Sequence, residues 1–382
     1  MTILAPFEEA VDIVLEAGGE PLRLCYQCGL CTATCPWNLV KSFHVRKIIL
    51  QSQLGLVDFE AEENWVCSTC HACVDRCPRG VQIIDVMRAL RRAMVSLGFG
   101  RVPHSLELAL KNIAGTGNPF GEAREKRTEW AKGKKVKGFA RGMEFLYFSC
   151  CIPAYAPEIQ RVAQATSDVL AKLKVDFGII GAEESCCGES VRKAGNESLF
   201  QALAQDNIRA FTEGGVKKIL VSSPHCYYTF KTEYPQLGGD FEVVHLSQHL
   251  SELIEKQKLA FSKKLNKKVT YHDPCYLGRH SGVYQEPRQV LKSIPGLELV
   301  EMPDSGEDAI CCGGGGGGIW METKKGERLS DVRLNQAIET GAEVLAVACP
   351  YCMLNFEDSV LTLAKGDVIE IKSIEELVQE AI

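Results

Sequence analysis

Five cysteines in the last third of the chain have the spacing of ligands to a single metal centre. They are Cys275, Cys311, Cys312, Cys349 and Cys352, arranged as C, CC and CxxC with 35 residues between the first two parts and 36 between the last two. Thiolates are soft ligands, and several of them gathered at one point select iron–sulfur clusters or zinc. The pattern therefore predicts a cluster-binding site that the rest of the chain either supplies with electrons or duplicates.

Two further cysteine sets near the N-terminus match the CxxCxxCxxxCP spacing of bacterial ferredoxins that hold two clusters, and they begin 42 residues apart. In that spacing the first three cysteines of a set bind one cubane, and the fourth reaches the other cluster. We therefore expect two [4Fe-4S] clusters. The predicted ligands are Cys25, Cys28, Cys31 and Cys77 for one cluster, and Cys67, Cys70, Cys73 and Cys35 for the other.

The stretches beside these two sets have helical character. Residues 43–54 follow the first set, and residues 81–97 follow the second. We therefore expect residues 1–98 to form an α-helical ferredoxin domain. His71 lies inside the second set. Because all four cysteines of that set are present, we expect His71 to be a neighbour of the cluster or a surface residue, not a ligand.

Residues 99–143 break this pattern. They contain scattered glycines and prolines and then a basic run between Arg124 and Arg141, without strong alternation of either secondary-structure period. We expect a linker here. Its positive charge is either that of a solvated connection or a docking surface for an acidic redox partner.

From Glu144 onward, short apolar runs alternate with helical stretches, which favours parallel sheets covered by helices. The fold class expected for the whole chain is therefore α/β, with an N-terminal helical ferredoxin domain. The predicted strands are Phe145–Ser149, Asp176–Ile180, Ile219–Ser222, Phe241–His245, Lys268–His272, Leu297–Met302, Val344–Ala348 and Val368–Ile371. The predicted helices include Pro157–Leu173, Leu199–Glu213, Ser247–Glu255 and Asp331–Glu339.

This α/β region is an internal duplication. Three landmarks recur at steady offsets of 124, 125 and 126 residues. Tyr147–Cys151 matches Tyr271–Cys275, Cys186–Gly188 matches Cys311–Gly313, and Gly215–Cys226 matches Gly341–Cys352. We therefore expect two homologous lobes, a first lobe over residues 144–262 and a second lobe over residues 263–382. Their cysteines follow strand ends, where α/β sheets place their sites.

The two copies differ at one ligand position. Ser223 stands in the first lobe where the second lobe has Cys349. A serine hydroxyl is a hard and weakly acidic group, which makes it a poor replacement for a thiolate on iron. The first lobe keeps four predicted metal ligands and an extra Cys150. These ligands are Cys151, Cys186, Cys187 and Cys226. They suit a [4Fe-4S] cluster or a tetrahedral zinc ion, or the site is empty.

Six glycines, residues 313–318, follow the second cysteine pair. They satisfy GxGxxG trivially, but no Lys-Ser/Thr follows, so a nucleotide site is weakly indicated. We interpret the run geometrically: residues without Cβ let the backbone approach a cluster and point N–H groups at its sulfurs. His225, His272 and Asp273 lie beside the cysteine motifs and are either proton donors or structural residues.

Composition excludes several classes of protein. The chain has 382 residues and a net charge of −6, without the basic footprint of a nucleic-acid binder. Its 18 cysteines are clustered in sets and make up too small a share of the chain for a disulfide scaffold. The first residues lack a basic n-region, and no apolar run is long enough to cross a membrane. We expect a cytoplasmic protein without direct membrane insertion.

The double CxxCxxCxxxCP module followed by two Cys-Cys-Gly repeats resembles heterodisulfide reductase, in the form that fuses a C-type ferredoxin subunit and a B-type catalytic subunit as a D-type chain. The resemblance spans about residues 20–360. It implies that a complete repeat binds a noncubane [4Fe-4S] cluster through five cysteines, and that a mixed disulfide is split between two such clusters. The second lobe matches this ligand pattern, whereas Ser223 interrupts it in the first lobe.

Related chains with one intact repeat are electron-transfer subunits of larger flavin- or quinone-linked complexes, including sulfite-reduction modules and benzoyl-CoA-reductase-type assemblies. The resemblance therefore implies an iron–sulfur oxidoreductase subunit that relays single electrons to the second-lobe site. The implied partners are flavin- and iron–sulfur-containing subunits, heterodisulfide reductase A-type or similar, in a hetero-oligomer. One alternative is a true CoM-S-S-CoB-type disulfide reductase. Another is an electron carrier whose first lobe is a zinc-stabilised docking platform.

Overall fold

The computed structural model describes residues 6–98 and 101–382, which form two compact units. The N-terminal unit consists of the described part of Met1–Leu108 together with Ser190–Phe200 and Gly313–Leu329. The C-terminal unit consists of Ala109–Glu189, Gln201–Cys312 and Ser330–Ile382. The sequence alone predicts contiguous domains. The structure instead brings the two segments that follow the cysteine pairs of the lobes into the N-terminal unit.

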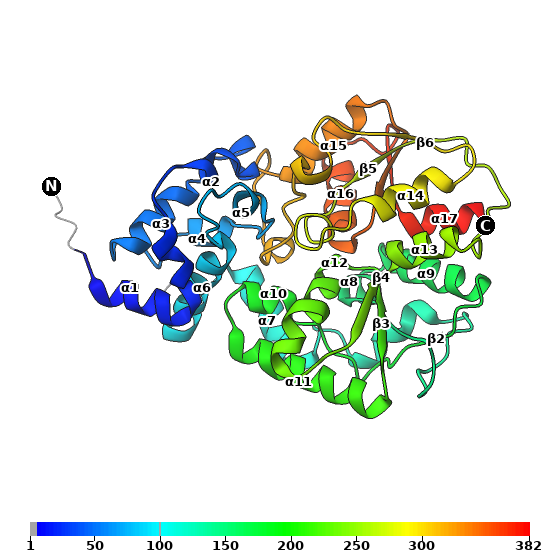
Figure 1. The fold of residues 1–382 in the computed structure, drawn as a ribbon, viewed down its shortest axis with the longest axis horizontal. Helices are drawn as coiled ribbons and strands as arrows, with labels where there is room; N and C mark the ends of the chain where they lie inside the picture. The colour runs from blue at the N-terminus through cyan, green and yellow to red at the C-terminus, as the bar shows by residue number, and fades with distance from the viewer. Residues whose placement is uncertain (1–5, 99–100) are drawn as a thin grey trace. The chain divides into compact units, whose positions relative to one another are not determined.

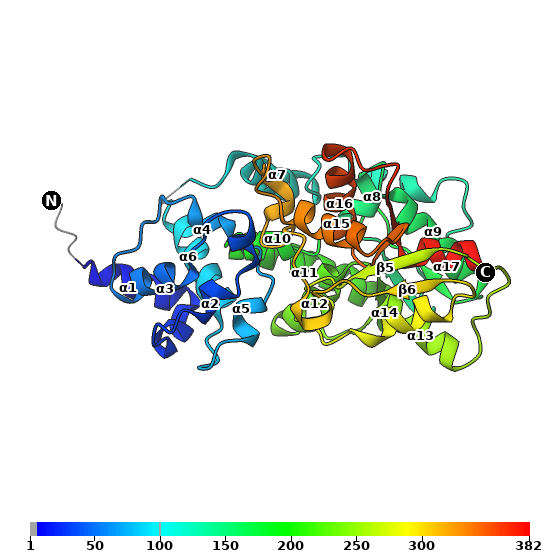
Figure 2. The same ribbon diagram turned by 90° about the horizontal axis from the view of Figure 1, so that it is seen from above.

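The N-terminal unit is helical, as the periodicity of residues 43–54 and 81–97 predicts. Its helices are α1 (Glu8–Val14), α2 (Leu30–Ala33), α3 (Val45–Gln53), α4 (Glu63–Val66), α5 (Ala72–Asp75) and α6 (Ile83–Leu97), with the shorter turns η1 (Leu15–Gly19), η2 (Glu20–Leu24) and η3 (Pro36–Leu39). Helix α6 buries Val86 and Leu90 completely, and α1 and α3 lie beside each other in this unit (Figures 1 and 2). Several cysteines of the ferredoxin-type sets pack against this core.

The C-terminal unit contains two sheets of four parallel strands with the same strand order, β2-β1-β3-β4 and β6-β5-β7-β8. The strands are β1 (Phe145–Phe148), β2 (Phe177–Gly178), β3 (Lys218–Val221), β4 (Glu242–His245), β5 (Lys268–His272), β6 (Glu298–Val300), β7 (Val344–Val347) and β8 (Glu370–Ser373). Each overlaps a predicted strand. The central strands β1 and β7 are buried throughout, as expected for strands covered on both faces. The repeated order confirms the two parallel-sheet lobes.

Helices connect the parallel strands, as such connections require. They are α8 (Cys151–Tyr155), α9 (Gln160–Lys172), α10 (Glu189–Lys193), α11 (Glu197–Gly214), α12 (Pro224–Tyr228), α13 (Leu246–Glu255), α14 (Gln285–Ser293), α15 (Leu329–Glu339), α16 (Pro350–Thr362) and α17 (Ile374–Ala381), with the shorter turns η5 (Thr229–Glu233), η6 (Tyr234–Leu237), η7 (Gly306–Asp308) and η8 (Gly318–Trp320). Helix α9 packs on α17, and α13 packs on α14. These contacts join the two lobes within the C-terminal unit (Figure 1).

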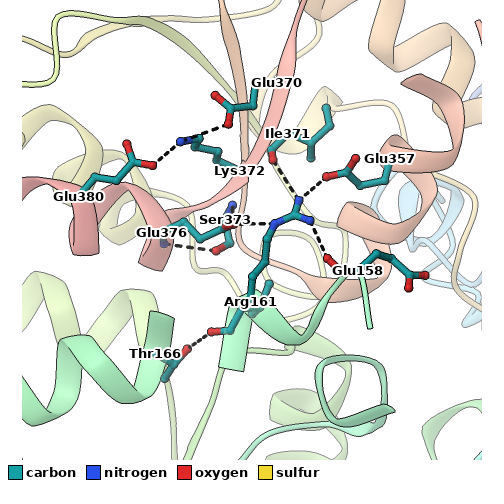
Figure 3. Close-up of polar contacts among 11 residues, drawn as sticks. Glu158, Arg161, Thr166, Glu357, Glu370, Ile371, Lys372, Ser373, Glu376 and Glu380 are labelled. Atoms are coloured by element: carbon teal, nitrogen blue, oxygen red, sulfur yellow. Dashed lines mark hydrogen bonds and ion pairs between the residues drawn. The ribbon is translucent and has the colours of Figure 1, made fainter. Parts of the chain in front are cut away.

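Ion pairs add to this contact between the lobes. Arg161 on α9 pairs with Glu357 on α16 and with Glu376 on α17, the latter with 2.9 Å between Nε and Oε1 (Figure 3). Arg161 also donates to the carbonyl of Ile371 in β8 at 3.3 Å. Because the Arg161 side chain is about one-third exposed, solvent screening keeps each pair within about 1 kcal/mol. The buried helix faces therefore contribute most of the stability of this contact.

Residues 99–143, which the sequence suggests are a linker, contain two helical segments. Residues 99 and 100 lie outside the described residues, but α7 (His104–Thr116) and the 3-10 helix η4 (Arg124–Ala131) occupy much of the segment. Leu106, Leu110 and Ile113 are buried at helical spacing on one face of α7. This short period is present in the sequence, but the flanking glycines and prolines obscure it.

Among the described residues, no helix combines the length and the apolar character that crossing a membrane requires.

Candidate metal centres

The second lobe brings its five predicted cysteines together in the interior, where each is 5% exposed or less. The sulfur atoms of Cys275 and Cys311 lie 3.9 Å apart, and those of Cys312 and Cys352 lie 3.3 Å apart. Cys349 contacts Cys352 through a side-chain hydrogen bond. The thiols therefore form two contacting groups, which the adjacent residues Cys311 and Cys312 bring together, and this donor set fits an iron–sulfur cluster.

The local fold explains why these cysteines meet. Strands β5 and β7 are neighbours in the sheet and run parallel, so the segments that follow them emerge at the same edge. Cys275 follows β5, and Cys349 follows β7 as the N-cap residue of α16. Pro350 occupies the first turn of α16, where a missing N–H costs little. Cys352 lies in the same first turn.

Cys349 is set apart from the other four thiols by its surroundings. Burial disfavours its thiolate, but hydrogen bonds with Cys352 and His225 outweigh burial and lower the pKa of Cys349 to about 5. His225 belongs to the first lobe. Burial alone would favour its neutral ring, but Glu189 and Cys349 raise the pKa of His225 to about 10. The side chain of His225 in the first lobe therefore faces the thiol of Cys349 in the second lobe.

The ring of His225 is held on both faces. It stacks on Tyr276 and on Tyr351, with 4.1 Å between ring centroids in each case. Its Nδ1 lies 3.3 Å from Oε2 of Glu189, which is fully buried. These contacts fix the direction in which His225 presents a hydrogen bond to the second-lobe site. The sequence places His225 beside a motif of its own lobe, but it does not reveal this contact.

The other two polar residues beside the motifs have different surroundings. A nitrogen of His272 and the sulfurs of Cys312 and Cys352 all lie within 4.8 Å of one another. Burial and then the positive charge of Arg333 lower the pKa of His272 well below its usual value, so its ring is neutral. Asp273 instead accepts two hydrogen bonds from Arg288, at 2.6 and 2.8 Å. The structure thus places His272 beside two of the second-lobe thiols and gives Asp273 a structural partner.

The first lobe also contains five gathered thiols. Each is buried, including the extra one at Cys150, and they form a chain of side-chain contacts. The contacts run from Cys150 to Cys226, from Cys226 to Cys187 with sulfurs 3.5 Å apart, from Cys187 to Cys186, and from Cys186 to Cys151. Sequence reasoning places four of these residues in a site and leaves Cys150 over. The structure brings all five together.

Arg127 lies at this first-lobe site, although the sequence places it in a solvated basic run. Its guanidinium is buried and pairs with the buried Glu184 at 2.8 Å. Nη1 also donates to the sulfur of Cys151 at 3.6 Å. Arg127 therefore brings positive charge to the thiols. No local signal separates Arg127 from its solvated neighbours, because its burial depends on distant segments.

The N-terminal unit groups the ferredoxin-type cysteines across the two sets. A cavity is lined by a cysteine of the first set and three of the second, Cys35, Cys67, Cys70 and Cys73, with Trp37 beside them. Of the other four, Cys31 is buried, Cys25 and Cys77 are half-buried and Cys28 is exposed. Cys31 interacts with Cys25 and Cys28, and Tyr26 interacts with both Cys28 and Cys77. In each grouping, three cysteines come from one set and the fourth comes from the other set, as the ferredoxin spacing requires.

The glycine run packs in the N-terminal unit against the loop that carries Cys67. A Cβ atom on Gly315 would lie 2.3 Å from the carbonyl oxygen of Ser68, and one on Gly316 would lie 2.3 Å from that of Cys67. Only glycine permits such an approach. The close neighbour of these glycines is therefore a backbone loop of a ferredoxin-type set.

Arg91 on α6 holds this arrangement in place and is fully buried. It donates to the carbonyl oxygens of Cys67 and Gly316, both at 2.8 Å. It also donates to the carbonyl oxygens of Asn64 at 2.9 Å and of Lys193 at 3.1 Å. One side chain thus ties the Cys67 loop to the segments that follow both cysteine pairs of the lobes.

Comparison with known families agrees with these cysteine sets. Residues 24–82 match the family described as a 4Fe-4S dicluster domain, and residues 145–231 and 269–357 each match the family described as a cysteine-rich domain. The D-type chain of dihydromethanophenazine:CoB–CoM heterodisulfide reductase from Methanosarcina barkeri is 33% identical over 393 residues, which cover 94% of each chain. The chain belongs to the heterodisulfide reductase D-type family of iron–sulfur oxidoreductases.

Two further relatives are longer than this chain. The probable iron-sulfur-binding oxidoreductase FadF of Bacillus subtilis is 36% identical over 330 residues, which cover 84% of this chain and 47% of that protein. EtfAB:quinone oxidoreductase of Syntrophomonas wolfei is 31% identical over 417 residues, which cover 94% of this chain and 58% of that protein. The chain therefore spans about half the length of these two relatives. Its dicluster and cysteine-rich domains make it an iron–sulfur oxidoreductase.

Proposed function

We propose that the chain is an electron-transfer subunit of a larger redox complex. When bound, iron–sulfur clusters supply one-electron transfer. The eight cysteines of the ferredoxin-type sets hold the two entry clusters, and the five second-lobe cysteines hold the terminal cluster. A flavin-containing partner takes the electrons on. The name of the relative EtfAB:quinone oxidoreductase supports a place for this chain in a similar, quinone-linked assembly.

The packing of the glycine run carries this proposal. Cys312 is followed directly by Gly313, and within four residues the chain reaches Gly316, whose carbonyl shares the Arg91 side chain with the carbonyl of Cys67. A predicted ligand of the terminal cluster is thus connected by a short segment of chain to the loop of a predicted entry-cluster ligand. The absence of side chains in this segment lets it pack closely on that loop.

Removal of an entry cluster tests the relay. Cys70→Ala removes a predicted ligand from the cavity in the N-terminal unit, and Cys275→Ala removes one from the second lobe. With a one-electron donor in anaerobic stopped flow, we expect Cys70→Ala to slow reduction of the second-lobe site severalfold, because that site is buried. Cys275→Ala should leave the reduction of the ferredoxin-type clusters unchanged. Equal second-lobe rates in wild type and Cys70→Ala contradict the relay.

A second function, reduction of a disulfide by this chain itself, is favoured by the nearly full-length match to a protein named as the D-type chain of a heterodisulfide reductase. In that case the second-lobe site also cleaves a CoM-S-S-CoB-type disulfide. The purified chain with reduced viologen distinguishes the two functions. A carrier consumes no disulfide until a partner protein is added, whereas consumption by the isolated chain assigns the catalytic function to it.

A further inference from the structure

We propose that Cys150 is the fifth thiolate ligand of an iron–sulfur cluster in the first lobe, and that it replaces the thiolate that the duplication lacks at Ser223. The proposed relay requires only the second-lobe site, so this inference goes beyond it. It adds a metal centre and assigns a ligand outside the repeated cysteine pattern.

The two lobes differ reciprocally at two matched positions. Ser223 of the first lobe corresponds to Cys349 of the second, and Cys150 of the first lobe corresponds to Pro274 of the second. Each lobe therefore has one cysteine across these two positions. The loss of a thiol after β3 is accompanied by the gain of a thiol after β1, and β1 and β3 are neighbouring parallel strands.

The structure places the thiol of Cys150 beside Ser223, the position at which the first lobe lacks a thiol. The Cys150 side chain contacts both Ser223 and Cys226. In the second lobe the matching contact joins Cys349 to Cys352. Cys150 therefore takes the same place in the chain of thiols that Cys349 takes in its own lobe, beside the last cysteine of the repeat.

Cys150 has a strained backbone conformation that is unusual for a residue other than glycine. Its φ of 67° and ψ of 158° lie in a region that is essentially restricted to glycine. A non-glycine residue persists there only where the surrounding structure holds it, and such residues cluster at functional sites. Pro274 could not adopt this backbone, because its ring fixes φ near −65°. The conformation is therefore specific to the lobe that needs a thiol at this position.

The hydroxyl of Ser223 does not cap the helix that it precedes. Ser223 is the N-cap residue of α12, where serine is favoured for capping, but its side chain makes no capping hydrogen bond. Cys349 has the same position at the start of α16 and likewise makes none. Ser223 thus occupies a ligand position but has no thiolate, and the neighbouring Cys150 supplies that thiolate.

The number of thiols favours a cluster over zinc. A structural zinc ion takes four ligands, which would leave one buried thiol without a role. A five-thiolate set is the same donor set that the second lobe presents. With Cys150 included, all 18 cysteines of the chain are assigned, eight in the ferredoxin-type sets and five in each lobe. The buried Arg127 beside Cys151 offsets part of the negative charge of such a site.

Metal analysis of the full chain, purified anaerobically, tests this proposal with three variants. Cys150→Gly removes the thiol and suits the backbone, so loss of the fold is not expected. Cys150→Gly/Ser223→Cys returns a thiol to the repeated position. Ser149→Ala alters a buried neighbour in the same loop and serves as the control. Iron, acid-labile sulfide and zinc are counted per chain, and the ferredoxin-type EPR signals report on folding.

We expect roughly sixteen irons per chain in wild type and Ser149→Ala, roughly twelve in Cys150→Gly, and a return to roughly sixteen in the double variant, because one [4Fe-4S] cluster contains four irons. A wild-type iron count in Cys150→Gly overturns the proposal. So does zinc in place of four irons in wild type, or a double variant that stays four irons short. None of these counts depends on electron transfer to the second lobe, so this proposal and the relay fail separately.

Discussion

The imidazole of His225, from the first lobe, hydrogen bonds to the thiol of Cys349 in the second lobe. Each lobe therefore contributes to the electrostatics of the second-lobe site. His225 is next to Cys226, a predicted ligand of the first-lobe site, so one short helix, α12, contacts both sets of thiols. The thiol sites of the two lobes in the C-terminal unit are therefore linked through α12.

His225→Phe should lower the reduction potential of the second-lobe cluster. Phenylalanine preserves the stack between Tyr276 and Tyr351 but donates no hydrogen bond to Cys349. Hydrogen bonds to cluster sulfurs favour the reduced state, which carries more negative charge. Loss of one such bond, about 1.4 kcal/mol, corresponds to about 60 mV for a one-electron couple. An EPR-monitored redox titration measures this shift.

The matched control for this variant is His280→Phe. His280 also stacks on Tyr276, with 4.1 Å between ring centroids. In His280→Phe, we expect the reduction potential of the second-lobe cluster to equal that of wild type. This change alters a ring that stacks on Tyr276 but leaves the hydrogen bond from His225 to Cys349 in place. If both variants shift the potential equally, the stack and not the hydrogen bond sets it.

Gly316→Ala should disrupt the cluster predicted in the cavity that Cys35, Cys67, Cys70 and Cys73 line. The new Cβ atom would lie 2.3 Å from the carbonyl oxygen of Cys67, so the loop must move. We expect loss of roughly four irons, one [4Fe-4S] cluster, with the EPR signal of the other ferredoxin-type cluster retained. Iron analysis and EPR of the anaerobic protein measure both.

Gly326→Ala is the control for the glycine prediction. Gly316 and Gly326 both have a positive φ, 63° and 85°, so alanine is strained at either position, but no described atom lies within 4 Å of a Cβ built on Gly326. Gly326→Ala should keep its full iron content. A loss of iron in both variants would assign the effect to backbone strain rather than to contact with the cluster loop.

Arg127→Met should destabilise the C-terminal unit by about 3–5 kcal/mol, because it leaves the buried Glu184 without its ionic partner. The apparent Tm of that unit in anaerobic calorimetry should fall by about 6 °C or more. Arg127→Met/Glu184→Gln should recover much of this loss. Lys126 is next to Arg127 in the chain and forms an exposed ion pair with Glu122. Lys126→Met removes this pair and should cost under about 1 kcal/mol of stability. Equal losses for Arg127→Met and Lys126→Met would refute the buried pair.

Cys349→Ala and Ser223→Ala alter the same position of the two repeats with opposite expectations. Cys349→Ala should abolish the paramagnetic signal of the second-lobe cluster on thiol oxidation and leave both ferredoxin-type signals intact. Ser223→Ala should leave the iron content unchanged, because Cys150 supplies the thiolate beside it. Loss of every signal in Cys349→Ala would indicate misfolding, and loss of iron in Ser223→Ala would make the hydroxyl a ligand.

The periodic elements of the fold could be predicted from the sequence. All eight strands overlap predicted segments, because strands buried on both faces appear as continuous apolar runs such as Val344–Val347. The duplication also predicts two sheets with one strand order. The two cysteine-rich domains and the dicluster domain confirm the family that the motifs indicate.

What the sequence could not provide depends on contacts between distant segments. Arg127 lies in a basic run whose other residues give no sign of burial, and it meets Glu184 across 57 positions. Gly316 meets Cys67 only because the chain returns to the N-terminal unit after Cys312. Cys150 falls outside the repeated motif, so its approach to Cys226 emerges only in three dimensions. Local sequence patterns do not predict such contacts.

The order in which the clusters of the wild-type chain are reduced tests the proposed relay most directly. Freeze-quench EPR after mixing the oxidised, anaerobic protein with a one-electron donor follows the signals of the ferredoxin-type clusters and of the second-lobe cluster together. We expect the ferredoxin-type signals to rise first and then to decline as the second-lobe cluster is reduced. Reduction of the second-lobe cluster before, or independently of, the ferredoxin-type clusters would contradict the relay.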